Sequence, residues 1–120
     1  MIDLLALAFL GDSLHTLYVR ENIVKTKPLK MDDINKLASK FCKASTQAKV
    51  LDRISDILSE EEKELVRKTR NIKNKHKAKN TDIMTYKKAT CFEALIGFHY
   101  LENNKERLTF LLEESMKGEN

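Results

Sequence analysis

Apolar residues recur at steps of three and four positions along most of this chain, the spacing that places them on one face of an α-helix. The first such segment runs from near Asp3 to about Val24 and holds Leu7, Leu10, Leu14, Leu17 and Tyr18. Later segments hold, in chain order, Ile34 to Cys42, Val50 to Leu58, Leu65 and Val66, Ile83 to Tyr100, and Leu108 to Met116. The pattern predicts an all-α fold, a compact bundle of about six helices, without a strand.

Polar residues before these segments predict where the helices begin. Asp32 or Asp33 is expected near the start of the second helix, and candidate caps are Ser45 or Thr46 for the third and Asn80 or Thr81 for the fifth. Ser59 and Glu62 have the spacing of a capping box for the fourth helix. Pro28 predicts a loop between the first two helices, because a proline disfavours helix at the residue before it. In the third helix, Ile57 and Leu58 are expected to face the core.

The composition agrees with one soluble globular domain spanning residues 1–120. Of the 120 residues, 42% are hydrophobic and 33% charged, which argues against disorder. One proline and three glycines leave few obligatory breaks, so long helices are favoured over hairpins.

The longest apolar run, Leu4 to Leu10, predicts a buried helix and not a membrane span. It is far shorter than the roughly 20 residues that a span requires. Asp3 precedes it, so the basic leader of a signal peptide is missing as well. We therefore expect a cytoplasmic protein with no membrane partner. Cys42 and Cys91 lie among apolar residues and are expected to be buried thiols, because the ligands of a zinc site are not near them.

Basic residues are concentrated after the fourth helix, although the net charge of the chain is only +4. The stretch contains Arg67, Lys68, Arg70, Lys73, Lys75, Lys77 and Lys79 without an acid among them. Residues 72–80 lack an apolar period and are predicted to form a basic loop. Such a segment favours a polyanionic partner, with nucleic acid first, but charge alone equally fits a solvated loop without a partner.

Two acids occupy unusual places, within the two most hydrophobic helices, where both carboxylates are expected to be buried. Asp12 follows an apolar run, and Glu93 lies between Phe92 and an apolar stretch. Gly11 directly precedes Asp12, and Gly97 follows Glu93 by one turn. A glycine inside a helix costs about 1 kcal/mol relative to alanine. We therefore expect the two helices to approach closely there and to bring both acids to one point.

Two carboxylates at one point repel unless a proton or a cation lies between them. Carboxylate oxygens completed by water and phosphate oxygens are the ligands that Mg²⁺ prefers. Asp12 and Glu93 are thus the candidate catalytic and metal-binding residues. The plainer interpretation is that the two acids are unrelated surface residues, and composition and period alone favour it.

The residues around the two acids resemble a known family. Phe9 to Ser13 is similar to the first signature of ribonuclease III catalytic domains, and Phe92 to Gly97 is similar to the second. The order of the two signatures and their spacing also suit that family. Its pattern has two further acids, one four residues before the aspartate and one three residues before the glutamate. Here Ala8 and Thr90 stand at those positions, so only Asp12 and Glu93 are carried over.

The chain resembles one branch of this family, mini-ribonuclease III, whose members are stand-alone catalytic domains. The resemblance rests on the two missing acids, the short chain and the lack of a second domain. The resemblance implies a magnesium-dependent endoribonuclease that cleaves double-stranded RNA and leaves a 5′-phosphate. It also implies a homodimer and a precursor of large-subunit ribosomal RNA as substrate. Duplex affinity would come from the basic segment, with Arg67, Arg70, Asn71, Lys73, Lys75, Lys77 and Lys79 as the candidate RNA-binding residues.

Other functions fit parts of the sequence. A non-catalytic RNA-binding or ribosome-associated helical protein would keep the basic segment, with Ala8 and Thr90 as signs of a decayed site. A helical interaction domain or a DNA-binding helix-turn-helix protein would not need the pair of acids. Within the enzyme hypothesis, Tyr86 is expected in the core or a dimer interface, and Ser13 in helix packing.

Overall fold

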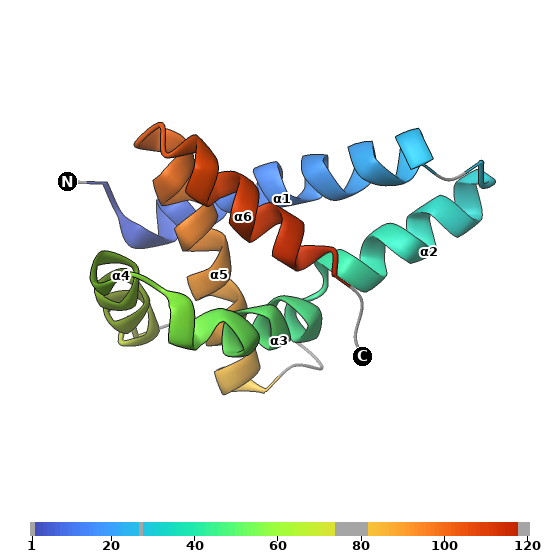
Figure 1. Ribbon diagram of the computed structural model, residues 1–120. Coiled ribbons are helices and arrows are strands. Elements are labelled where there is room, and N and C mark those ends of the chain that lie inside the picture. Colours follow the sequence, from blue (N-terminus) through green and yellow to red (C-terminus); the bar gives the residue numbers. More distant parts are fainter. Residues whose placement is uncertain (1, 27, 74–81, 118–120) are drawn as a thin grey trace.

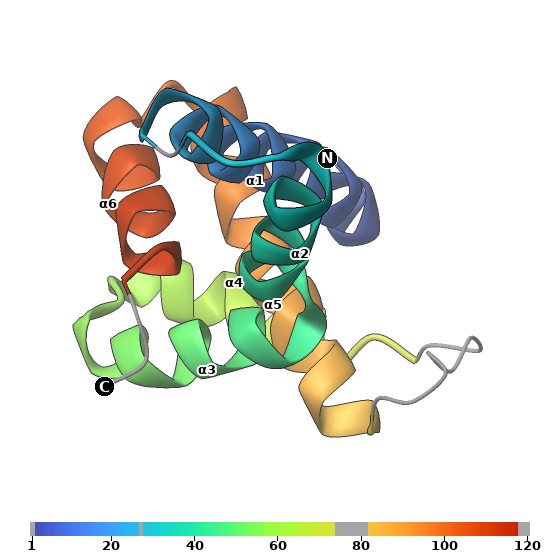
Figure 2. The same cartoon turned by 90° about the vertical axis from the view of Figure 1, so that its right-hand side faces the viewer.

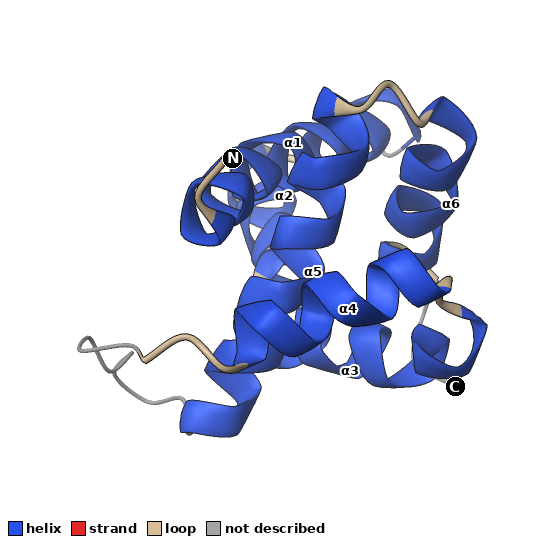
Figure 3. Cartoon of the chain, turned by 90° about the vertical axis from the view of Figure 1, so that its left-hand side faces the viewer, coloured by secondary structure: helices blue, strands red, loops and turns tan. Residues whose placement is uncertain are grey.

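The computed structural model describes residues 2–26, 28–73 and 82–117, and every regular element in these ranges is helical. The elements are α1 (Leu4–Thr26), α2 (Met31–Cys42), α3 (Ala44–Ile54), the 3-10 turn η1 (Ser55–Ile57), α4 (Glu60–Arg70), α5 (Ile83–Leu101) and α6 (Lys105–Ser115). Figure 3 shows helices and loops and no strand in this part of the chain. The predicted all-α bundle of six helices is confirmed.

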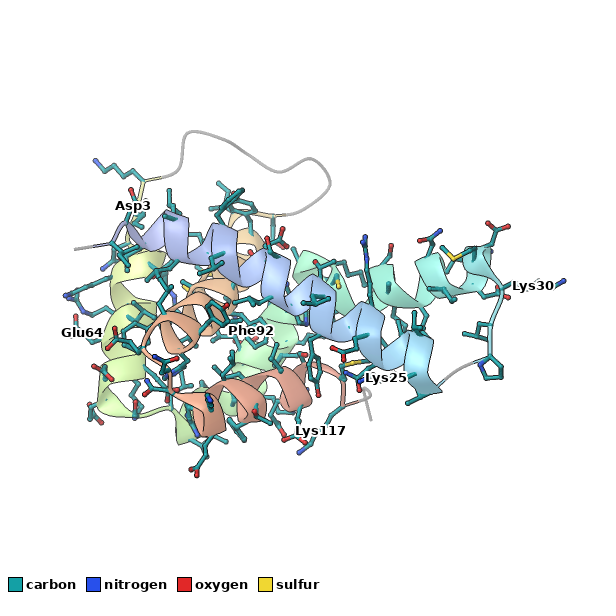
Figure 4. All side chains as sticks on the ribbon, turned by 90° about the horizontal axis from the view of Figure 1, so that it is seen from above. Asp3, Lys25, Lys30, Glu64, Phe92 and Lys117 are labelled. Atoms are coloured by element: carbon teal, nitrogen blue, oxygen red, sulfur yellow. The ribbon has the colours of Figure 1, made fainter. Side chains whose placement is uncertain are left out.

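Helix α5 is the centre of the fold and packs against α1, α3, α4 and α6 (Figure 1). Its residues Phe92, Leu95 and Ile96 have no solvent exposure, and Figure 4 shows Phe92 in the interior between the surrounding helices. A helix that is apolar on most sides has to be covered on most sides. Helices from both ends of the chain provide this cover.

Helix α2 runs back along the second half of α1, so the two form an antiparallel pair (Figures 1 and 2). Val19 and Ile23 of α1 pack with Ala38 of α2 in a small core of their own. None of the helices in residues 2–26, 28–73 and 82–117 combines the length and the apolar character that crossing a membrane requires.

Helices α1 and α5 cross in backbone contact at two glycines. A Cβ atom added to Gly11 would lie 1.8 Å from the carbonyl oxygen of Glu93, and one added to Gly97 would lie 2.1 Å from that of Leu7. Both positions therefore require glycine, because any side chain would overlap the backbone of the other helix. The close approach predicted from the two glycines is confirmed, and each glycine faces the helix of the other.

Several predicted details at the helix ends are wrong. Helix α3 begins after Lys43, so Ser45 and Thr46 lie inside it and neither caps it. Asp82 caps α5 by accepting a hydrogen bond from the Thr85 amide at 2.8 Å; of the predicted caps, Asn80 and Thr81 lie outside the described residues. Ile57 is 56% exposed in η1, whereas the core was predicted for it.

A buried ion-pair cluster joins α4 to α5 and α6. Glu62 forms the predicted capping box with Ser59 and is only 1% exposed. Its carboxylate accepts hydrogen bonds from Arg107 Nε at 2.8 Å and faces His99 Nε2 at 2.7 Å. Burial alone would raise the pKa of Glu62, but the hydrogen bonds from Arg107, the Ser59 amide and His99 outweigh it and lower the pKa to about 2.

Candidate active site

The helix crossing brings Asp12 of α1 and Glu93 of α5 together, within hydrogen-bonding reach of each other. The juxtaposition expected from the sequence is therefore present. Their burial differs from the expectation, because Asp12 is exposed and Glu93 is half-buried. Asp12 thus faces solvent at the rim of the site, and Glu93 forms its inner wall.

Both acids line a surface hollow of about 450 Å³ between α1 and α5. Its lining consists of Leu5, Ala8, Phe9, Asp12, Tyr86, Thr90 and Glu93. Ala8 and Thr90, which replace the two further acids of the ribonuclease III signatures, also line this hollow, and neither provides a carboxylate. Tyr86 also lines it, although the sequence placed that residue in the core or an interface. The hydroxyl of Thr90 donates to the Tyr86 carbonyl oxygen at 2.9 Å and is engaged within its own helix.

Burial raises the pKa of Glu93 to about 9, and the carboxyl group of Asp12 beside it acts in the same direction. A hydrogen bond from Gln47 opposes the shift. Without a cation, Glu93 therefore holds a proton at neutral pH. A divalent cation between the two carboxylates would reverse this, because it favours the ionised form of both.

Two buried residues behind Glu93 were missed by the sequence analysis. The amide nitrogen of Gln47, on α3, lies 3.4 Å from Glu93 Oε2 and 3.0 Å from His15 Nδ1. Gln47 is 3% exposed and His15 is 1% exposed. The available signal was a polar residue inside the apolar stripe of α3, beside Ala48. It did not identify the partner, which lies 46 positions further along the chain.

The structure describes only some of the candidate RNA-binding residues. Arg67, Arg70, Asn71 and Lys73 are exposed, and Lys75, Lys77 and Lys79 lie outside the described residues. The guanidinium of Arg67 is paired with Glu64, which reduces the positive charge that it offers to a ligand. Arg70 is close enough to Cys91 for its charge to act on that thiol, so the end of α4 lies beside α5.

The two cysteines are free thiols, as expected, but only Cys91 is buried and Cys42 is half-buried. Within residues 2–26, 28–73 and 82–117, no group of three or more His, Cys, Asp or Glu side chains could hold a metal ion. Among these residues, the protein part of a metal site at Asp12 and Glu93 would consist of the two carboxylates.

Comparison with known proteins supports the same reading of the two signatures. The model of the Ribonuclease III domain matches residues 5–104. A Mini-ribonuclease 3 of Thermoanaerobacter sp. (strain X514) is 43% identical over 113 residues, which cover 94% of this chain and 80% of that protein. A Mini-ribonuclease 3 of Staphylococcus aureus is 38% identical, covering 93% of this chain and 85% of its own.

A solved structure agrees at the level of the fold. The crystal structure of a Fusobacterium nucleatum protein matches with a TM-score of 0.83 and 30% identity, over 92% of this chain and 88% of the other. The family match spans most of the chain and includes both helices that carry the acids. The chain belongs to the ribonuclease III family, in its Mini-ribonuclease 3 branch.

Proposed function

We propose that this protein is a magnesium-dependent endoribonuclease that cuts double-stranded RNA at the hollow between α1 and α5, with Asp12 and Glu93 as its catalytic, metal-binding acids. Membership of the ribonuclease III family makes it an endoribonuclease of duplex RNA. The observation that carries the site assignment is the meeting of the two acids across the glycine crossing.

The donor set fits a hard divalent cation. Asp12 and Glu93 supply only oxygen atoms, and in the protein alone burial, together with the nearby Asp12, raises the pKa of Glu93 to about 9. Oxygen ligands and tolerance for several bound waters are the properties that Mg²⁺ requires. The two carboxylates would hold the ion, while water and RNA oxygens would complete its shell, since Ala8 and Thr90 offer no carboxylate.

Each residue of the site has a separate task in this proposal. A bound Mg²⁺ would lower the pKa of a coordinated water and stabilise charge on the phosphate. Asp12, exposed at the rim, is open to an approaching phosphodiester, whereas the half-buried Glu93 is fixed by its surroundings. The backbone contact at Gly11 sets the separation of the two carboxylates. Hydrolysis would leave a 5′-phosphate, as the family resemblance implies.

Duplex binding is assigned to the basic segment that leaves α4. Arg70, Asn71 and Lys73 are exposed there, and α5, which follows the same connection, carries three residues that line the hollow, namely Tyr86, Thr90 and Glu93. A positively charged segment that follows α4 suits duplex RNA, which proteins recognise mainly through its phosphates and its shape. Lys75, Lys77 and Lys79 extend this charge in the sequence.

A homodimer in the cytoplasm that matures a large-subunit ribosomal RNA precursor completes the proposal. The dimer is supported by the apolar surface of α1, on which Phe9 is 78% exposed, Leu17 62% and Val24 66%. An exposed apolar surface along one helix is what a second protein chain would cover. Phe9 also borders the hollow, so a partner seated on it would lie next to the acids.

The test is cleavage of a long double-stranded RNA by the purified protein, with Mg²⁺ and with EDTA. Asp12→Asn and Glu93→Gln keep the shape of each side chain and remove its charge, and both should abolish Mg²⁺-dependent cleavage. Asp56→Asn, in exposed η1, is the matched control and should cut at the wild-type rate. Wild-type rates in both site variants would refute the mechanism. A folded wild-type protein that binds duplex RNA and never cuts it would favour the non-catalytic RNA binder.

A further inference from the structure

The amide of Gln47 connects the candidate metal site to a buried histidine. Its nitrogen faces two acceptors at once, Glu93 Oε2 at 3.4 Å and His15 Nδ1 at 3.0 Å. A glutamine amide nitrogen carries two N–H groups, so it can donate one to each. The three residues come from α3, α5 and α1, so the network joins three helices at the site.

His15 is held as a neutral hydrogen-bond acceptor. Burial lowers its pKa to about 4, although the charge of Asp12 opposes the shift. Its ring packs edge-on against Phe92, with the ring centroids 5.5 Å apart. Its Nε2 is buried and has no hydrogen-bond partner in the described part of the chain. In the tautomer whose Nδ1 accepts from the Gln47 amide, the single proton of the neutral ring lies on Nε2.

This arrangement fixes which end of the Gln47 amide faces Glu93. A half-turn of the amide would place its oxygen against His15 Nδ1 and against the Glu93 carboxylate, which are both acceptors. Once a bound cation has ionised Glu93, its carboxylate can only accept hydrogen bonds, so it selects the orientation in which the amide nitrogen faces it and also donates to His15 Nδ1. Water cannot replace these hydrogen bonds if the amide turns, because Gln47 is only 3% exposed.

We infer that Gln47, held in place by His15, is a positioning residue that fixes the Glu93 carboxylate for binding of the metal ion. The inference rests on the proposed function, because it assumes that Glu93 is a metal ligand. A ligating carboxylate is normally oriented by an outer hydrogen bond, and loss of such a partner typically costs about 10- to 100-fold in metal affinity or activity. A purely structural role would instead change only the stability of the fold.

The experiment compares the wild-type chain with Gln47→Met, His15→Leu and the double variant. Binding of Mn²⁺ to the RNA-free protein is followed by electron paramagnetic resonance. The Mg²⁺ concentration for half-maximal single-turnover cleavage gives a second measure. Gln47→Met keeps the length of the side chain and should weaken Mn²⁺ binding about tenfold. His15→Leu should weaken it less, and should add nothing in the Gln47→Met background, because His15 acts through Gln47.

Thr69→Val is the matched control, because it removes a buried hydroxyl whose hydrogen bond, to Leu65, stays within α4. It should leave Mn²⁺ affinity unchanged. Wild-type Mn²⁺ affinity in Gln47→Met would overturn the inference and leave the proposed function intact. Should that variant not fold, His15→Leu decides in the same way. Asp12→Asn separates the two proposals: Mn²⁺ binding that it does not weaken would overturn the metal site itself, and the inference with it.

Discussion

A single methyl group at the crossing of α1 and α5 tests how the site is held together. We expect Gly11→Ala and Gly97→Ala each to destabilise the protein and to impair cleavage. The added carbon at Gly11 would lie 1.8 Å from the Glu93 carbonyl oxygen, whereas ordinary contact begins at 3.4 Å. The helices would therefore have to separate there by the difference, about 1.6 Å.

The energetic consequence follows from what the added atom meets. At each glycine the added atom meets the backbone of the other helix, so no change of side-chain rotamer can relieve the overlap. The cost should therefore reach or exceed the upper end of the roughly 1–3 kcal/mol that overpacking usually costs. Alanine recovers about 1 kcal/mol through its higher helix propensity. The net loss in the free energy of unfolding should be about 2 kcal/mol or more. For Gly11→Ala the displaced backbone is that of Glu93, and a misplacement of about 1 Å can reduce a rate about 100-fold.

Urea denaturation measures the stability, and single-turnover cleavage of duplex RNA at saturating Mg²⁺ measures the function. Ser39→Ala, on the exposed face of α2, is the control, and its stability should stay within about 0.5 kcal/mol of the wild type. Wild-type stability in both glycine variants would refute the close crossing. A destabilised Gly11→Ala that cuts at the full rate would refute the idea that the crossing sets the geometry of the acids.

Two further predictions concern other parts of the molecule. Glu62 has a pKa of about 2 when folded and an ordinary value of 4.5, so its ion pair with Arg107 stabilises the fold above pH 4.5 and is lost as the pH falls toward 2. The stability advantage of the wild type over Glu62→Gln should therefore shrink by up to about 3 kcal/mol across that window in urea titrations, and an advantage that is constant with pH would contradict the assignment. Neutralising the lysines of the basic segment (Lys73, Lys75, Lys77 and Lys79) should weaken duplex RNA binding and flatten its dependence on salt concentration. Neutralising exposed Lys36 and Lys40 of α2 should leave the salt slope as it was, and equal slopes in all three proteins would remove the segment from the binding surface.

The sequence was sufficient for the helices and for their close crossing, whereas composition and period alone left the two acids unrelated and the family resemblance paired them. The helical period is strong in most segments, and few glycines or prolines interrupt it. The crossing could be predicted because Gly11 and Gly97 carry a cost in helix propensity that only close packing explains. In each case the signal is local, so neighbouring residues are enough to detect it.

The burial of individual polar residues could not be predicted in the same way. Helix α1 is apolar on its outer face as well, with Leu17 62% and Val24 66% exposed, so the apolar run around Asp12 suggested burial that is absent. Gln47 shows the opposite error, because a polar residue on a short helix is normally solvated. It is buried because His15 and Glu93 satisfy its amide from two other helices, and a single sequence does not reveal such distant partners.

The glycine crossing and the Gln47 network solve different parts of one problem. Bringing Glu93 close to Asp12 in a half-buried place raises its pKa to about 9, so the metal-free site costs free energy that the rest of α5 has to offset. Gly11 lets the two helices approach closely, and the buried contacts of Leu7 and Ala8 with Ala94 oppose their separation. Rotation of the carboxylate away from Asp12 would be the remaining escape, and the hydrogen bond from Gln47 opposes it. The metal-free site meets this constraint by protonation of Glu93, and in the proposed mechanism a bound cation would let both carboxylates ionise without moving either helix.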